Sequence, residues 1–207
     1  MALSPDILIT PIPPAATGVE IAATVVEFFT FFTCTVNIII QIYIIFLKIY
    51  DDAIEKFEQE KTFQWKKGTP PNEESFKNDL VNNEIYVATI DSKVVGVMTF
   101  LLNGEEDYNE IDGSWINDGR YLTIHRIAVL KECYGKGIGY KLIEFAKDYC
   151  LKNGYYNIRI DTHVRNFDMK KLLTRNGFVY TGIIKLRNKN NDLRDAYQID
   201  LKYGKNC

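Results

Sequence analysis

The stretch Tyr134–Gly139 reads YGKGIG and places glycine at every second position. It follows an apolar segment, Tyr121–Val129, that predicts a strand, and it leads into Ile138–Lys152, where apolar residues recur at helical spacing. Glycine allows a tight turn and leaves the backbone N–H groups uncovered. These N–H groups would lie at a helix N-terminus, where the helix dipole favours negative charge. The glycine turn (Tyr134–Gly139) therefore predicts a binding site for a pyrophosphate.

The segments on either side predict helices and strands in mixed order. In chain order, we expect a helix over Ile49–Lys61, a short helix capped by Asn72, a hairpin of strands Glu84–Ile90 and Val94–Leu102, and, after the central unit, strand Tyr155–Asp161, helix Phe167–Arg175 and strands Phe178–Leu186 and Leu193–Leu201. A helix that links two neighbouring strands makes them parallel. The predicted fold class is therefore α+β, with one domain built on a mixed central sheet flanked by helices.

The N-terminal region departs from this regular pattern. Residues Met1–Gly18 are rich in proline and predict a disordered leader, and Phe28–Leu47 then runs for 20 positions without a charge. That length suits a membrane-spanning helix, but Asn37 and Gln41 interrupt the apolar density. We expect an atypical N-terminal extension over residues 1–36 and the domain over residues 37–207. The apolar run is either a buried part of the fold or a membrane anchor.

Composition excludes some classes of function. The net charge is −2 and the sequence has no basic stripe, which argues against a nucleic-acid partner. The four cysteines, Cys34, Cys133, Cys150 and Cys207, have no C-x-x-C spacing, and the chain has only two histidines, so we expect no metal site. Scattered cysteines are typical of a reducing compartment. The sequence predicts a cytoplasmic protein, with anchoring to a membrane through residues 28–47 as the alternative.

A dinucleotide site is the first alternative for the glycine turn. Such a site needs G-x-G-x-x-G after a strand and an acidic residue about 20 positions further on. Asp161 stands near the position of that acid, but the third glycine is missing. Tyr140 occupies its place when the count starts at Gly135, and Leu142 when it starts at Gly137. Because a bulky residue there blocks close packing of helix on strand, an NAD(P)-binding oxidoreductase is the least favoured function.

The motifs taken together resemble the GNAT superfamily of acyl-CoA-dependent N-acyltransferases. The superfamily signature R/Q-x-x-G-x-G/A, after a strand that ends apolar-Ala-Val, falls on Tyr134–Gly139 after Ile127–Val129. Other segments are similar to the family's downstream motif and to a bacterial-type subgroup: Asn166 with Met169, Leu172 and Asn176–Phe178, and the segments Gln64-Trp65, Gly113–Trp115, His125–Ala128 and Ile160–His163. The resemblance covers roughly Ile49–Leu201.

The resemblance implies an N-acetyltransferase that moves acetyl from acetyl-CoA to a primary amine by direct attack, without a metal. It implies contacts to the cofactor from the strand end, the glycine turn and one asparagine: Ile127, Ala128, Val129, Tyr134, Gly135, Lys136, Gly137, Ile138, Gly139, Tyr140 and Asn166. The partner would be a small-molecule or peptide amine. A homodimer and membrane association through residues 28–47 stay open.

Two positions depart from the family pattern. Tyr134 stands where the family carries Arg or Gln near the CoA phosphates, and Leu173 stands where many members carry a tyrosine that protonates the leaving thiolate. These departures motivate an alternative function, a catalytically idle CoA-binding or regulatory module.

The attacking amine must lose a proton, and a neutral imidazole suits that role near pH 7. We expect His125 to be this base, with His163 as the second candidate; either histidine could instead be structural. We expect Trp65 and Trp115 to line the substrate pocket, although aromatic side chains of this size also serve as packing. The acidic loop Glu105–Asp112 either attracts a cationic amine or only aids solubility.

Overall fold

The computed structural model describes residues 6–12, 25–62, 64–102, 104–187 and 192–202, with side chains in the first helix described from Ile42 onward. The elements in chain order are β1 (Leu8–Pro11), α1 (Val25–Gln59), α2 (Glu73–Val81), β2 (Ile85–Ile90), β3 (Lys93–Leu101), η1 (Glu106–Asn109), β4 (Ile111–Gly113), β5 (Tyr121–Val129), η2 (Lys131–Cys133), α3 (Ile138–Lys152), β6 (Asn157–His163), α4 (Phe167–Arg175), β7 (Val179–Leu186) and β8 (Asp192–Asp200).

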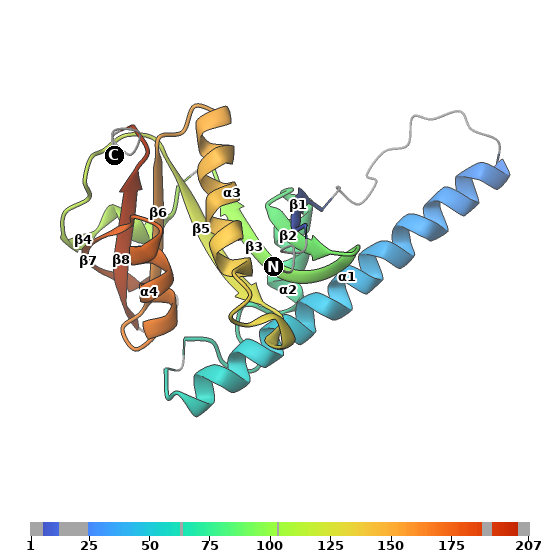
Figure 1. Cartoon of the computed structure of the whole chain (residues 1–207), viewed down its shortest axis with the longest axis horizontal. Coiled ribbons are helices and arrows are strands. Elements are labelled where there is room, and N and C mark those ends of the chain that lie inside the picture. The colour runs from blue at the N-terminus through green and yellow to red at the C-terminus, as the bar shows by residue number, and fades with distance from the viewer. Residues whose placement is uncertain (1–5, 13–24, 63, 103, 188–191, 203–207) are drawn as a thin grey trace, which may run out of the picture.

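One mixed sheet organises the molecule (Figure 1). Its strand order is β1-β2-β3-β5-β6-β8-β7-β4; β5 and β6 are parallel and the other neighbours are antiparallel. In β2, Ile85 and Val87 pack against α1 and α2, whereas Tyr86 and Ala88 pack on the opposite face with α3. Successive side chains of a strand point to opposite faces of the sheet, so β2 contributes to the core on each face. The predicted α+β class and mixed sheet are confirmed.

The N-terminal region contributes more to the sheet than the sequence predicts. Leu8–Pro11 pairs antiparallel with β2, so the disorder predicted for Met1–Gly18 is wrong over β1. Ile12, the next residue, is buried between α1 and the sheet. Proline does not prevent this pairing because Pro11 lies at the end of an edge strand. The boundary expected between residues 36 and 37 falls inside α1.

Helix α1 is longer than the predicted Ile49–Lys61, and its N-terminal half extends past the sheet (Figure 1). Its C-terminal half buries Phe46, Ile49 and Tyr50 against α2 and the sheet. Among the helices whose side chains the structure describes, none is long and apolar enough to cross a bilayer. The side chains of residues 28–41, most of the apolar run, lie outside the described residues, so the proposed anchor stays a prediction.

Candidate active site

A cleft opens where β5 and β6 separate. The two strands pair only over Tyr121–Thr123 and Asn157–Arg159, at the start of each strand. Beyond Thr123, the edge of β5 that faces β6 has no strand partner within the described part of the chain, while β6 stays paired with β8 as far as His163. Separation of parallel strands leaves backbone N–H and C=O groups of β5 free to bind an extended ligand.

A β-bulge at Arg126 sets the direction of β5 beside this cleft. The register with β3 shifts between Val97 and Thr99, and Arg126 has a left-handed φ of 51°. Two helices hold the bulge. The Tyr50 hydroxyl of α1 donates to the Arg126 carbonyl at 2.6 Å, and Nη1 of Arg126 donates to both Asp79 oxygens of α2 at 2.8 and 2.7 Å.

Asp79 is therefore a structural partner of β5. It is almost fully buried and also accepts a hydrogen bond from the Thr99 hydroxyl at 3.1 Å. Burial raises the pKa of Asp79, and Arg126 opposes that rise. Arg126 therefore forms a structural ion pair with Asp79.

The glycine turn lies at one end of the cleft. Gly135 and Gly137 have left-handed φ values of 73° and 78°, and Gly137 is the N-cap of α3, so glycine is required here by backbone conformation. A cavity of about 540 Å³ opens beside the turn and continues along the end of β5. It is lined by these residues of the predicted cofactor set: Ile127, Ala128, Val129, Tyr134, Gly135, Gly137, Ile138, Gly139, Tyr140 and Asn166; Lys136 does not line it.

A second cavity of about 300 Å³ lies between β5 and β6. His125, Glu105 and Asp161 line it. The two cavities share five lining residues, Phe57, Trp65, Ile127, Asn166 and Met169. They are thus adjoining chambers. We call the one beside the glycine turn the outer cavity and the one beside His125 the inner cavity.

His125 faces a carboxylate. Its Nε2 lies 3.0 Å from Oε2 of Glu105, and both side chains are about one-fifth exposed, at 21% and 23%. The ring N–H is not aligned with this oxygen, and Nε2 makes no geometrically good hydrogen bond to any described residue. The contact with His125 lowers the pKa of Glu105 more than burial raises it. The sequence indicated Glu105 only as one member of an acidic loop.

Glu105→Gln is expected to change how stability depends on pH. A carboxyl group whose pKa is lower in the folded state than in the unfolded state stabilises the fold at pH values above the unfolded pKa, which is about 4.3. This stabilisation is lost as the pH falls through the folded pKa. Urea unfolding at a series of pH values should therefore separate wild type from E105Q above this range and bring the two together in stronger acid. Parallel stability curves would show that the contact does not stabilise the fold.

The inner cavity has a negative balance of charge. The carboxylates of Glu105, Asp107 and Asp161 line it, and Asp161 accepts a hydrogen bond from the buried Tyr108 hydroxyl at 2.7 Å. The two arginines that also line it are paired with carboxylates outside its lining, Arg126 with Asp79 and Arg194 with Asp192. The inner cavity is therefore suited to a positively charged ligand.

Gln64 joins β6 to the start of α4. Its Oε1 accepts hydrogen bonds from the Thr162 hydroxyl at 3.0 Å, the His163 N–H at 3.1 Å and the Asn166 side chain at 2.8 Å. Asn166 also caps α4 by accepting from the Met169 N–H. Gln64 thus holds Asn166 at the point where the two cavities meet. The Gln64-Trp65 pair was the sequence signal for this contact.

Two predicted site residues lie elsewhere. His163 lines neither cavity; its Nδ1 accepts from the Arg165 N–H at 3.1 Å, and burial lowers its pKa. Trp115 also lines neither cavity: its indole N–H donates to the Tyr108 carbonyl at 3.0 Å, and the Arg159 guanidinium lies over its ring at 4.2 Å. Trp65 borders both cavities.

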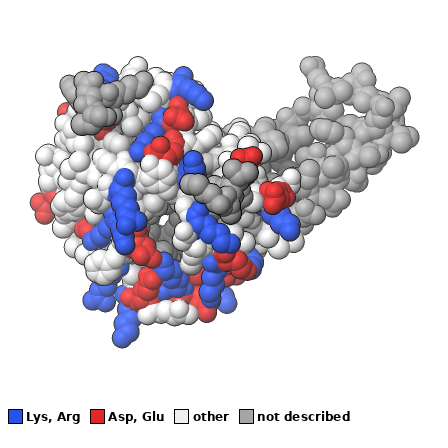
Figure 2. Space-filling model, in the orientation of Figure 1, with Lys and Arg blue, Asp and Glu red and all other residues white. Residues whose placement is uncertain are grey.

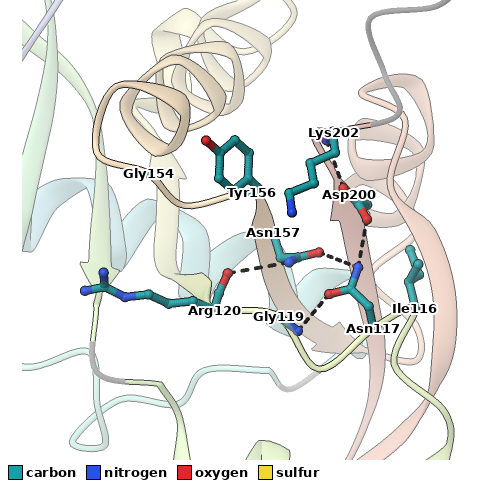
Figure 3. Close-up of a pocket in the computed structure, with 9 residues that line it drawn as sticks. All are labelled: Ile116, Asn117, Gly119, Arg120, Gly154, Tyr156, Asn157, Asp200 and Lys202. Atoms are coloured by element: carbon teal, nitrogen blue, oxygen red, sulfur yellow. Dashed lines mark hydrogen bonds between the residues drawn. The ribbon is translucent and has the colours of Figure 1, made fainter.

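A hollow of about 450 Å³ lies at the other end of β6 (Figure 3). Its polar side chains bond to one another: the Asn117 amide donates to Asn157 at 3.0 Å and to Asp200 at 2.8 Å. No residue of the predicted site lies there. On the face shown in Figure 2, basic and acidic side chains are mixed.

A mixed sheet with separated parallel strands, and a glycine turn that starts a helix at the cleft, place the chain in the class of proteins with an acetyltransferase (GNAT) fold. The pattern that describes the Acetyltransferase (GNAT) family matches residues 47–178. The chain belongs to the GNAT family, and the resemblance of its motifs is confirmed.

Individual relatives agree with this assignment. The chain is 33% identical over 98 residues to streptothricin acetyltransferase of Escherichia coli, and spans about half the length of this curated relative: the match covers 47% of the chain and 48% of the relative. A GNAT family acetyltransferase from Streptococcus agalactiae is 27% identical, with a TM-score of 0.67 over 79% of this chain and 90% of the other. A GNAT family acetyltransferase from Elizabethkingia anophelis, solved with acetyl-CoA bound, shares the fold at 20% identity, with a TM-score of 0.50 over 66% of this chain and 95% of the other.

Proposed function

We propose that the chain transfers acetyl from acetyl-CoA to a primary amine by direct attack on the thioester. One observation carries the proposal: the cavity beside the glycine turn and the cavity beside His125 adjoin at five shared residues. A thioester donor in the outer cavity and an amine in the inner cavity would meet there. The cofactor set and His125 predicted from the sequence supply the residues of this proposal.

The outer cavity suits the donor. The backbone N–H groups at the start of α3 would hold the diphosphate, with Gly135 and Gly137 leaving them uncovered. The unpaired edge of β5 from Ile127 to Val129 would bond the pantetheine amides. Asn166 lies across the cleft, on α4.

His125 is the proposed base. Because Glu105 faces Nε2, we assign the ring proton to that nitrogen, which leaves Nδ1 free to accept the proton of the attacking amine. As the C–N bond forms, the C–S bond breaks and CoA leaves as the thiolate. Glu105 stabilises the imidazolium that results. Leu173, at the position of the family's tyrosine, is fully buried in the core and supplies no proton to the thiolate.

The acceptor in this proposal is a cationic amine. Glu105, Asp107 and Asp161 give the inner cavity its negative balance, which favours an acceptor with a second positive group. The name of the Escherichia coli relative makes streptothricin one acceptor to assay. This interpretation favours attraction of substrate over solubility as the role of the acidic loop.

Thermal unfolding tests the donor. Acetyl-CoA at about 100 times its Kd is expected to stabilise the protein by about 2.7 kcal/mol, which raises Tm by several degrees, because a ligand that binds only the folded state shifts the equilibrium. NAD(P) at the same concentration is the control and should leave Tm unchanged. A rise with NAD(P) but not with acetyl-CoA would support an oxidoreductase instead.

Thiol release tests the reaction. Amines of increasing positive charge, streptothricin among them, are mixed with acetyl-CoA and the free thiol is measured. We expect release with cationic amines and little with anionic amines of similar size. Binding of acetyl-CoA without release from any amine would favour the idle CoA-binding module.

A further inference from the structure

Tyr134 begins the glycine turn at the position where the family carries Arg or Gln, yet a basic side chain lies directly beside it. The ammonium group of Lys56 lies 5.3 Å from the centre of the Tyr134 ring. Lys56 belongs to α1, far from the glycine turn in sequence. A cation at this distance from an aromatic ring is held by the ring's electrostatic field.

Lys56 lines the outer cavity together with Ala53 and Phe57 of the same helix. It forms an ion pair with Asp168 in the first turn of α4 and a longer one with Glu60, at 3.7 Å. Its side chain is 30% exposed. Burial lowers the pKa of Lys56, but the two carboxylates outweigh burial and the net shift is upward, so the ammonium keeps its charge.

The end of the cavity near α4 is positively charged. Three basic residues, Lys56, Lys171 and Arg175, line the cavity against one carboxylate, Asp168, which leaves a balance of +2. This balance is opposite in sign to that of the inner cavity. The outer cavity therefore suits the anionic part of a donor, and the inner cavity suits a cationic acceptor.

We propose that Lys56 binds a phosphate group of the acyl-CoA donor and so replaces the basic or amide side chain that the glycine turn lacks. This inference rests on the proposed function. Tyr134 positions the ammonium group beside the turn by its ring. An ammonium has three N–H donors, so Lys56 can keep its contact with Asp168 while it donates to a phosphate oxygen.

Lys56→Met tests the proposal, because methionine is unbranched and of similar length but has neither a charge nor an N–H donor. We expect the KM for acetyl-CoA to rise about tenfold, with kcat little changed, because one charge-assisted hydrogen bond to the donor is lost. Acetyl-pantetheine, which has no phosphate, should react equally well with wild type and K56M. Acetyl-dephospho-CoA locates the contact: a penalty that persists assigns it to the diphosphate, and one that disappears assigns it to the 3′-phosphate; both support the proposal.

Lys48→Met is the matched control. Lys48 lies on the same helix and also forms an ion pair, with Glu132 at 2.6 Å, but it does not line the cavity. We expect K48M to keep the wild-type KM. The double variant K56M/Y134R should regain most of the lost affinity for acetyl-CoA, since arginine restores the family's basic side chain.

Three results would overturn the proposal: an unchanged KM for acetyl-CoA in K56M, an equal loss with acetyl-pantetheine, or an equal loss in K48M. If K56M does not fold, K56R replaces it. The retained charge should then keep KM near wild type, and a tenfold rise would count against a phosphate contact through charge. Failure of wild type to bind acetyl-CoA would instead refute the proposed function, so the two failures are distinguishable.

Discussion

His125→Ala is expected to lower kcat by about 10²-fold or more, with little change in the KM for acetyl-CoA, because general-base catalysis contributes about that factor. His125 lines the inner cavity and faces Glu105, but it does not line the outer cavity where the donor would bind. Steady-state kinetics with a cationic amine measures both parameters.

The other histidine is the matched control. His163 lines neither cavity, and its Nδ1 is occupied by the Arg165 N–H, so His163→Ala should keep most of the activity. The pair of variants separates the two histidines that the sequence left as candidates. Wild-type turnover of H125A over roughly pH 6 to 9 would remove His125 from the mechanism.

Asp79→Ala is expected to have the largest effect on stability, lowering the free energy of unfolding by about 3 kcal/mol. The change leaves the Arg126 guanidinium and the Thr99 hydroxyl without the carboxylate that both contact. The value is at the lower end of the range for a broken buried pair because the Arg126 side chain is 25% exposed. Urea denaturation followed by circular dichroism measures the difference.

Asp148 provides the control for this experiment. It is an exposed aspartate on α3, so Asp148→Ala should change stability by less than about 0.5 kcal/mol. Arg126→Ala, alone and combined with Asp79→Ala, completes a double-mutant cycle. A coupling near zero would mean that the pair does not hold the bulge.

Local signals in the sequence predicted most of the fold. The bounds of α3 and α4 agree with the prediction, because a glycine turn starts one, Asn166 caps the other, and apolar spacing is regular in α3. The hairpin of β2 and β3 was found from its short turn, where Asp91 has a left-handed φ of 49°. Each of these signals lies within a few residues of the element that it predicts.

Elements that depend on distant partners were missed. Strands β1 and β4 have four and three residues and are stabilised by pairing with β2 and β7, so their own sequences carry little pattern. Contacts between distant segments of the chain also form the candidate site. Glu105 meets His125, and Lys56 meets Tyr134, only when segments far apart in sequence fold together.

The bulge at Arg126 divides β5 into two halves. Side chains alternate between the two faces of the sheet in both halves, but the order is reversed after the bulge. Before it, Leu122 and Ile124 belong to the core beneath α3; after it, Ala128 belongs to the core beneath α1, although an even spacing from Ile124 would place it beneath α3. Deleting one residue here would not merely shorten the strand. It would rotate the strand end by half a turn, which would exchange the face of Ala128 with that of Ile127 and Val129. The edge of β5 that we propose to bind the donor would then turn away from the cleft.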